Sequence, residues 1–250
     1  MRIIVNADDL GLSESVNRAI FHGMQRQVIT SATMLANGPA VKAAARELKR
    51  FPDCSFGVHL NLTEFEPVCP GSLRDLRSIL NENKCFNGNS VREVHIGVPM
   101  LRAIYREWCS QVDTLIQLGV EPSHFDAHHH VHTIPQLLPV LRALRRRYKI
   151  DKVRLSRNMY DESQDPGRVL LAQKWAFNLA LRATRFRTTR IFTDLLTFVR
   201  KCSSRAPDAP SAELMTHPGS LAKDGEADLL AEYWPSKLSY DVALISYKTL

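Results

Sequence analysis

Asp126-Ala127-His128-His129-His130-Val131-His132 forms a short run between two segments with helical periodicity, residues 99–118 and 135–148. In both segments apolar side chains recur every three or four residues. A strand between two helices is the repeating unit of a parallel α/β sheet. We therefore expect an extended strand, and the alternation of strand side chains places Asp126, His128, His130 and His132 on one face.

Several imidazoles beside a carboxylate indicate a metal site. Neutral imidazole is the commonest side-chain ligand of divalent transition metals in proteins. Alternate strand residues lie roughly 6–7 Å apart, so only one or two of these side chains reach the same ion. We assign His128 to the metal, and we expect Asp126, His130 and His132 to support the ligands or to contact substrate. A polar surface loop is the alternative interpretation of the same run.

The amino-terminal segment ends in a second polar cluster. Residues 2–7 are rich in aliphatic side chains and predict a strand, which continues into Asn6-Ala7-Asp8-Asp9-Leu10-Gly11. Adjacent strand residues point to opposite sides, but a turn that starts at Asp9 would bring Asp8 and Asp9 into one cavity. Aspartates are also frequent in turns and at helix N-termini, so this pair alone leaves a structural role open.

Three further predicted strands carry polar side chains. Residues 56–63 alternate cleanly, which places His59 and Asn61 on the face opposite the apolar residues. In residues 152–157, Arg154 points away from its apolar neighbours, and an inward Arg needs a site carboxylate or an anionic part of the substrate. The strand over 212–216 leads into His217-Pro218-Gly219, where the chain turns sharply.

Eight short strands alternate with helices along the chain. Strands are expected over residues 2–7, 29–36, 56–63, 126–132, 152–157, 191–199, 212–216 and 242–247, and helices over 15–24, 39–50, 99–118, 135–148, 168–184 and 224–234. This order predicts an α/β fold, a (β/α) barrel of the TIM type that can be irregular, in a single domain over residues 1–250.

The barrel also predicts where the site lies. Active sites of such barrels form at the carboxyl ends of the strands, so Asp8, Asp9, His59, His128 and His217 are expected to meet there. Residues 64–98 hold many Pro, Gly and Asn residues and are expected to form a loop over the active face.

Charge is unevenly distributed along the chain. The 250 residues carry a net charge of +7, and residues 142–205 hold 17 Lys or Arg against 5 Asp or Glu. Such a stretch attracts nucleic acid or anionic lipid, but no nucleic-acid-binding motif accompanies it. We therefore expect solvated helix faces, no nucleic-acid partner, no transmembrane segment, and at most peripheral contact with a membrane.

Cysteine usage and the amino terminus favour a cytoplasmic protein. The five cysteines are scattered and form no C-x-x-C pair, which argues against a disulfide framework and against a cysteine zinc site. Asp8 and Asp9 interrupt the apolar run at the amino terminus before it is long enough for the apolar region of a signal peptide. The sequence does not determine the oligomeric state, and it is compatible with a homodimer.

One carboxylate and two imidazoles describe an open catalytic metal site. We assign Asp9, His59 and His128 to one divalent ion, Zn²⁺ or Mg²⁺, and two imidazoles suit zinc or another transition metal better than magnesium. Such an ion polarises a carbonyl and acidifies a water molecule. Asp8 is then the general base, and His217 is the acid that protonates the leaving group. This set of residues would hydrolyse an amide or an ester.

Four motifs resemble those of the YdjC-like carbohydrate deacetylases, a family that includes chitooligosaccharide deacetylases and a hopanoid-biosynthesis-associated branch. They are residues 6–11, 57–63, 126–132 and 213–219, and residues 153–155 and 244–247 are similar to the family's later strands, so the resemblance covers nearly the whole chain. It implies a barrel-like deacetylase fold with a divalent metal, often described as magnesium, on Asp9, His59 and His128. The implied reaction releases acetate from an N-acetylated amino sugar or glycolipid. The division of roles between Asp8 and Asp9 rests on this resemblance.

Two other functions remain as alternatives. Amidohydrolases and phosphoesterases also carry His-x-His on a barrel strand, but usually on the first strand, where this chain has Asp8 and Asp9. A non-catalytic metal-binding or sugar-binding protein is the second alternative, although binding alone does not require Asp8 beside Asp9.

Overall fold

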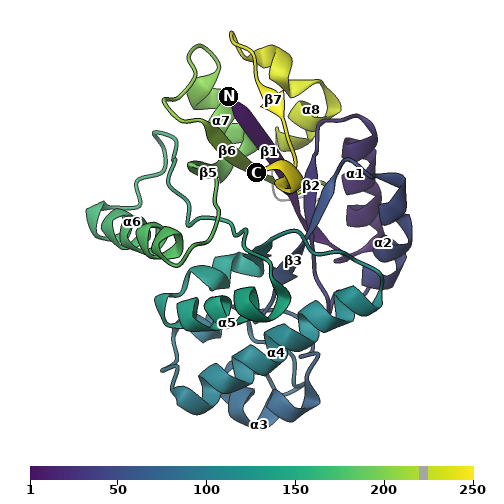
Figure 1. Ribbon diagram of the computed structural model, residues 1–250, viewed down its shortest axis with the longest axis vertical. Helices are drawn as coiled ribbons and strands as arrows, with labels where there is room; N and C mark the ends of the chain where they lie inside the picture. Colours follow the sequence, from purple (N-terminus) through teal and green to yellow (C-terminus); the bar gives the residue numbers. More distant parts are fainter. Residues whose placement is uncertain (220–224) are drawn as a thin grey trace.

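A curled parallel sheet forms the centre of the molecule (Figure 1). The computed structural model describes residues 1–219 and 225–250. Within them the strand order is β4-β3-β2-β1-β6-β5, and β7 pairs with the start of β1. The strands are β1 (Arg2–Leu10), β2 (Ser31–Met34), β3 (Ser55–Leu60), β4 (Phe125–Ala127), β5 (Ile191–Asp194), β6 (Ser211–Thr216) and β7 (Ala243–Leu244).

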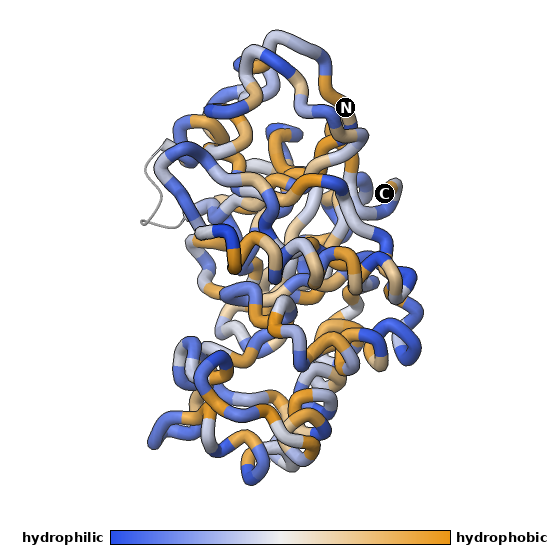
Figure 2. The backbone as a smooth tube through the Cα atoms, turned by 90° about the vertical axis from the view of Figure 1, so that its left-hand side faces the viewer, coloured by the Kyte–Doolittle hydropathy of each residue, from blue (hydrophilic) through white to orange (hydrophobic). Residues whose placement is uncertain are grey.

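Helices connect the strands and pack around the sheet (Figure 1). They are α1 (Glu14–Gln25), α2 (Val41–Glu47), α3 (Leu73–Leu76), α4 (Val98–Gln117), α5 (Leu138–Tyr148), α6 (Arg168–Ala183), α7 (Leu195–Cys202) and α8 (Glu226–Ala231). Residue 224 of the expected helix over 224–234 lies outside the described ranges. Of residues 225–234, α8 takes Glu226–Ala231, and residues 232 and 233 form a turn. Figure 2 shows apolar and polar segments alternating along the chain, as helices with one buried side require.

The central strand β1 separates an apolar face from a polar one. Ile3, Val5 and Ala7 are fully buried in the main core. The alternate residues Asn6 and Asp8 are also buried, but they face the concave side of the sheet with their polar groups. The alternation of side chains along β1 therefore places the Asp8 carboxylate on the inside of the curled sheet.

A complete eight-stranded barrel is not formed by the described residues. The expected strand over 152–157 is reduced to isolated bridges, in which Val153 pairs with Phe125 and Lys152 pairs with Arg187. No two consecutive residues pair with the same neighbour, so the segment bridges β4 and Arg187, which precedes β5, without becoming a regular strand. The expectation of an α/β fold with a barrel-like sheet is confirmed, and the closed TIM-type barrel is not.

Five other predicted strands are shorter than expected. The strands over 29–36 and 56–63 are reduced to Ser31–Met34 and Ser55–Leu60. β5 ends at Asp194, because its carboxylate accepts a hydrogen bond from the Thr197 backbone N–H at 2.8 Å and so starts α7. The last strand contains only Ala243 and Leu244. The strand over 126–132 ends at Ala127, and a 3₁₀ segment follows it.

Residues 64–98 pack against α4. Both carboxylate oxygens of Glu107, in the middle of α4, accept backbone N–H groups, from Val68 at 2.9 Å and from Cys69 at 2.8 Å. Gln111, one turn later, bonds both the N–H and the carbonyl of Asn61. The start of this region is thus fixed to α4, and its expected position over the active face stays a prediction. No helix in residues 1–219 or 225–250 is long and apolar enough to span a bilayer.

Candidate metal centre and active site

Three ligand-type atoms converge at the carboxyl end of the sheet. Asp9 Oδ1 lies 3.3 Å from His59 Nε2 and 2.9 Å from His128 Nδ1, and the two imidazole nitrogens are 3.3 Å apart. Three donors that share an ion with bonds of about 2.0–2.1 Å must lie roughly 3 Å from one another. These three side chains could therefore hold one divalent ion.

A bulge in β1 brings both aspartates to this site. The pairing of β1 with β2 shifts register between Ala7 and Leu10, and Asp9 adopts a left-handed backbone with φ 70°. Asp8 follows the strand alternation onto the concave side, and the left-handed turn at Asp9 returns its side chain to the same side. The turn expected at Asp9 is present, and it costs backbone strain that non-glycine residues seldom bear.

His59 is oriented by its neighbour in the adjacent strand. His59 of β3 pairs in register with Asp126 of β4, and the Asp126 carboxylate lies 2.7 Å from His59 Nδ1. Thr33 of β2 donates to the other oxygen of Asp126 at 2.9 Å. Burial alone would lower the pKa of His59, but the Asp126 carboxylate outweighs it and raises this pKa to about 10. With Nδ1 bonded to Asp126, Nε2 is the nitrogen that faces Asp9 and His128.

The chemistry of this atom set fits a bound cation. Asp9 Oδ1 is buried and accepts no hydrogen bond, although two imidazole nitrogens lie within 3.3 Å of it. A buried carboxylate oxygen without a donor is costly unless a cation compensates it. Asp8, His59 and Asp126 form an alternative group, but Arg154 already bonds both carboxylates there. The set of Asp9, His59 and His128 is therefore the better candidate.

Arg154 is fully buried among three carboxylates. It bonds Asp8, approaches Asp126 Oδ2 with Nη1 at 2.8 Å, and donates from Nε to Glu213 at 2.7 Å. Tyr247 donates its hydroxyl to the other oxygen of Glu213 at 2.5 Å. Burial would raise the pKa of Asp8, but the Arg154 guanidinium outweighs it and holds this pKa well below its usual range. The side chain of Arg154 thus pairs with site carboxylates, one of the two roles considered from the sequence.

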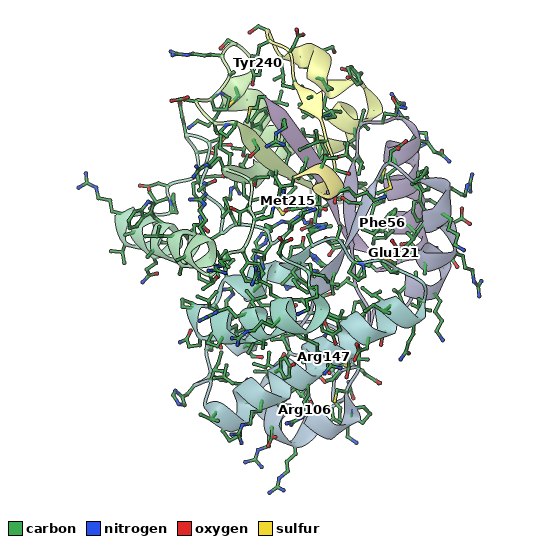
Figure 3. The ribbon with its side chains drawn as sticks, in the orientation of Figure 1. Phe56, Arg106, Glu121, Arg147, Met215 and Tyr240 are labelled. Carbon is green, nitrogen blue, oxygen red and sulfur yellow. The ribbon has the colours of Figure 1, made fainter. Side chains whose placement is uncertain are left out.

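His217 also approaches Asp8. It follows β6, the strand that pairs with β1 along residues 2–7. Its Nε2 lies 3.9 Å from Asp8 Oδ2, and its backbone N–H donates to Glu226 at 2.5 Å. Figure 3 shows nitrogen and oxygen atoms concentrated inside the molecule near Met215, two residues before His217. Arg154 and His217 therefore both approach Oδ2 of Asp8.

The other residues of the His-rich run do not share one face. His129 and His130 both adopt left-handed backbone angles, with φ 49° and 57°, so the predicted alternation through His132 is wrong. His130 packs its ring edge-on against Phe192, and His132 is fully buried with Nε2 3.3 Å from the carbonyl oxygen of Arg154. Neither lies in the three-residue cluster.

Asn61 has a local structural task. Its side-chain oxygen accepts the backbone N–H groups of Thr63 and Glu64, and its amide nitrogen donates to the carbonyl of Glu64 at 2.8 Å. These bonds fold the turn that follows β3. Asn61 therefore acts on the site by placing Glu64.

Glu64 and His129 were missed by the sequence analysis. Glu64 Oε2 lies 3.4 Å from His128 Nε2, and His129 Nδ1 lies 3.0 Å from the Thr63 hydroxyl. Together with His128 they form a further group that could hold a cation. Glu64 follows the polar end of β3, and this position at a strand's carboxyl end was the available signal.

The comparisons with known proteins identify the family. A sequence model of the family described as YdjC-like protein matches residues 2–240. The chain belongs to the YdjC-like family. The family expected from the four motifs is thereby confirmed.

Relatives of this YdjC-like chain carry the name carbohydrate deacetylase. The protein from Geobacillus stearothermophilus is 41% identical over 148 residues, which are 59% of this chain and 57% of that protein. The protein from Brevibacillus brevis is 30% identical over 231 residues, 88% of this chain and 82% of that protein. The first of these alignments thus spans less than two thirds of the relative's length.

A solved structure shares the fold of the YdjC-like chain. The crystal structure of a "putative cellobiose-phosphate cleavage protein" from Enterococcus faecalis V583 superposes with a TM-score of 0.75. The superposition covers 99% of this chain and 98% of that chain, at 23% sequence identity. At this identity the likeness establishes the fold alone.

Proposed function

We propose that this YdjC-like chain is a metal-dependent hydrolase that removes the N-acetyl group of an amino sugar. The observation that carries the proposal is the convergence of Asp9, His59 and His128 at 2.9–3.3 Å, with Asp8 and His217 beside them. The relatives named carbohydrate deacetylases support the sugar as the substrate class.

Asp9, His59 and His128 would hold the ion. Two imidazoles and one carboxylate favour Zn²⁺ or a similar transition metal over Mg²⁺, which prefers an all-oxygen shell. The chemistry that a bound divalent ion supplies is polarisation of the amide carbonyl and a more acidic water molecule. Asp126 keeps Nε2 of His59 directed at this position through its contact with Nδ1.

Asp8 and His217 divide the proton transfers. Arg154 keeps Asp8 ionised, so Asp8 can take a proton from the attacking water at one of its oxygens. His217, whose Nε2 lies 3.9 Å from Asp8 Oδ2, donates a proton to the nitrogen of the departing amine. Glu64, 42% exposed at the side chain, stands on the open side next to His128 and contacts the substrate or the water there.

The sugar is an N-acetylated amino sugar, either free or carried on a glycolipid. A phosphoesterase or amidohydrolase is the second candidate, because the same ligand types serve those reactions. A binding protein without turnover is the third. The Arg154–Asp8 pair favours an enzyme over a binding protein, since binding a metal on three ligands requires no further, charge-compensated carboxylate.

Acetate release tests the proposal directly. The protein is incubated with N-acetylglucosamine, diacetylchitobiose and lipid-linked N-acetylglucosamine, with and without chelator and with added Zn²⁺ or Mg²⁺. We expect acetate from at least one sugar, loss of release with chelator, and recovery with one of the ions. Metal-dependent cleavage of a phosphate ester without acetate release would replace the proposal with the phosphoesterase. Bound metal without turnover on any substrate would replace it with the binding protein.

A further inference from the structure

Helix α6 exposes an apolar surface. Eight large hydrophobic residues are exposed in the described part of the chain, and five of them belong to this one helix: Val169, Leu170, Leu171, Trp175 and Leu179. Trp175 has 69% of its surface exposed. Figure 1 shows α6 projecting from the body of the molecule, well away from the sheet. Isolated exposed apolar residues are ordinary, but a group of them on one element indicates a binding surface.

Three of the five exposed residues form a row along one side of the helix. Leu171, Trp175 and Leu179 are spaced by four residues, so they lie next to one another along the helix. The buried Phe177 and Leu181 lie on the other side together with Leu170, and the buried Asn178 lies at the margin between the two sides. A helix on a protein surface normally turns its polar side to water. Here the outward side holds a tryptophan, two leucines and the exposed alanines Ala172 and Ala176.

The same segment is strongly basic. Residues 168–190 contain six Lys or Arg and no Asp or Glu. Four of the six are exposed, Arg168, Arg185, Arg187 and Arg190, and of these Arg187 already donates to the Leu250 carbonyl oxygen. Three acidic residues precede the helix, but Asp161 and Asp165 already accept hydrogen bonds within their own loop. Trp and Leu on one side with Arg at the ends is the composition of helices that lie in a membrane–water interface.

We propose that α6 docks the protein on an anionic lipid bilayer, with Trp175 and its leucine neighbours in the interfacial layer. A second copy of the chain is a poorer occupant of this side, because pairing two such helices would bring like charges together. We call the row of Leu171, Trp175 and Leu179 the apolar strip. An anionic bilayer is complementary both to this strip and to the flanking arginines.

The inner side of α6 lines a cavity that docking would place next to the membrane. Leu170, Lys174 and Phe177 line a cavity of about 450 Å³, together with His130 and Arg157 at the carboxyl end of the sheet. A docked α6 would hold this cavity at the level of the lipid headgroups. The docking proposal does not rest on the proposed deacetylation, because binding to vesicles is measured without turnover.

The three tryptophans make the test possible without a label. Trp108 and Trp234 are fully buried, so Trp175 is the tryptophan that a lipid surface can reach. We expect a blue shift of the fluorescence on addition of vesicles of phosphatidylglycerol and phosphatidylcholine, and quenching by brominated lipids. The Trp175→Phe variant should still co-sediment with these vesicles but lose the spectral response. Vesicles of phosphatidylcholine alone should bind more weakly, and added salt should weaken binding to the anionic vesicles.

Charge substitutions on α6 and α4 distinguish docking through α6 from non-specific hydrophobic binding to vesicles. Trp175→Glu combined with Leu179→Glu should weaken co-sedimentation by about tenfold or more, since it places carboxylates in the interfacial layer. The matched control is Val98→Glu combined with Ile116→Glu, because these exposed residues of α4 lie outside the strip. The control should bind as the wild type does, and circular dichroism should show both variants folded.

Two results would overturn the proposal. The first is wild-type protein that stays in solution with anionic vesicles and keeps its fluorescence unchanged. The second is a wild-type dimer in sedimentation velocity that the Trp175→Glu, Leu179→Glu variant converts to a monomer, without vesicle binding by either. That result would assign the apolar strip to a second copy of the chain.

Discussion

Arg154 bonds both oxygens of Asp8, with Nη1 2.7 Å from Oδ2 and Nη2 2.6 Å from Oδ1. Both residues are buried, Arg154 completely and Asp8 with 2% of its surface exposed. A two-pronged pair of this kind fixes the plane of the carboxylate as well as its charge. The candidate general base is therefore held in one orientation, with His217 Nε2 3.9 Å from its Oδ2.

Removing Arg154 should destabilise the fold. Arg154→Met leaves Asp8, Asp126 and Glu213 buried without their shared cation, and breaking a buried ion pair in this way costs about 3–5 kcal/mol. Urea denaturation followed by circular dichroism measures the change. Arg147→Met is the control, because the Arg147–Asp113 pair is exposed and its loss should change the stability little. Equal stability of the two variants would mean that the three carboxylates are protonated in the folded protein.

Replacing Asp8 should separate catalysis from metal binding. Asp8→Asn keeps the size of the side chain but removes the proton acceptor, so kcat for acetate release should fall by about 10²–10⁴-fold. Metal content, measured by mass spectrometry of the purified protein, should stay near that of the wild type. Glu64→Gln is the matched variant, because Glu64 is a second carboxylate near the proposed ion, with Oε2 3.4 Å from His128 Nε2. A larger loss of kcat in Glu64→Gln than in Asp8→Asn would transfer the role of base to Glu64.

The position of the site was accessible to sequence reasoning because parallel strands end at a common edge. Asp8, His59 and His217 each stand at the end of a strand with a clear pattern, and the register that pairs Ala7 with Thr216 brings two of these ends together. An inward Arg154 required carboxylates, and its three partners are all on neighbouring segments. Strand alternation and charge compensation therefore suffice for this part of the site.

Backbone angles that no residue pattern encodes account for what was missed. His129 and His130 take left-handed conformations, which cost a non-glycine residue about 1–2 kcal/mol and are imposed by the surrounding packing. The strand therefore stops at Ala127. Glu64 reaches His128 only because Asn61 folds the turn before it, and that hydrogen bonding depends on tertiary structure. Asp194 ended a predicted strand by capping a helix, a signal that was present in the sequence but weaker than the apolar run around it.

The ligand set is tested by removing each imidazole. His59→Ala and His128→Ala should each lose most of the bound metal, because two remaining ligands hold a divalent ion poorly. Metal content and the affinity for added Zn²⁺ are measured for both proteins. His22→Ala, an exposed histidine of α1, should keep its full metal content. A full complement of metal in both site variants would rule out this ligand set.

The contact between Asp126 and His59 should tune metal affinity without supplying a ligand. Asp126 Oδ1 lies 2.7 Å from His59 Nδ1, which directs Nε2 towards Asp9 and His128. In Asp126→Asn the amide oxygen should take the position of Oδ2, because that atom must still accept the Thr33 hydroxyl. The amide NH₂ then faces His59 Nδ1. Since NH₂ is a donor, it disfavours a proton on Nδ1. We expect Zn²⁺ affinity, measured by competition with a chelating dye, to fall about 10–100-fold. Asp194→Asn, at the end of β5, is the control and should bind Zn²⁺ as the wild type does, because asparagine also caps helices well. An unchanged affinity in Asp126→Asn would show that the packing around His59, rather than this carboxylate, sets the direction of its Nε2.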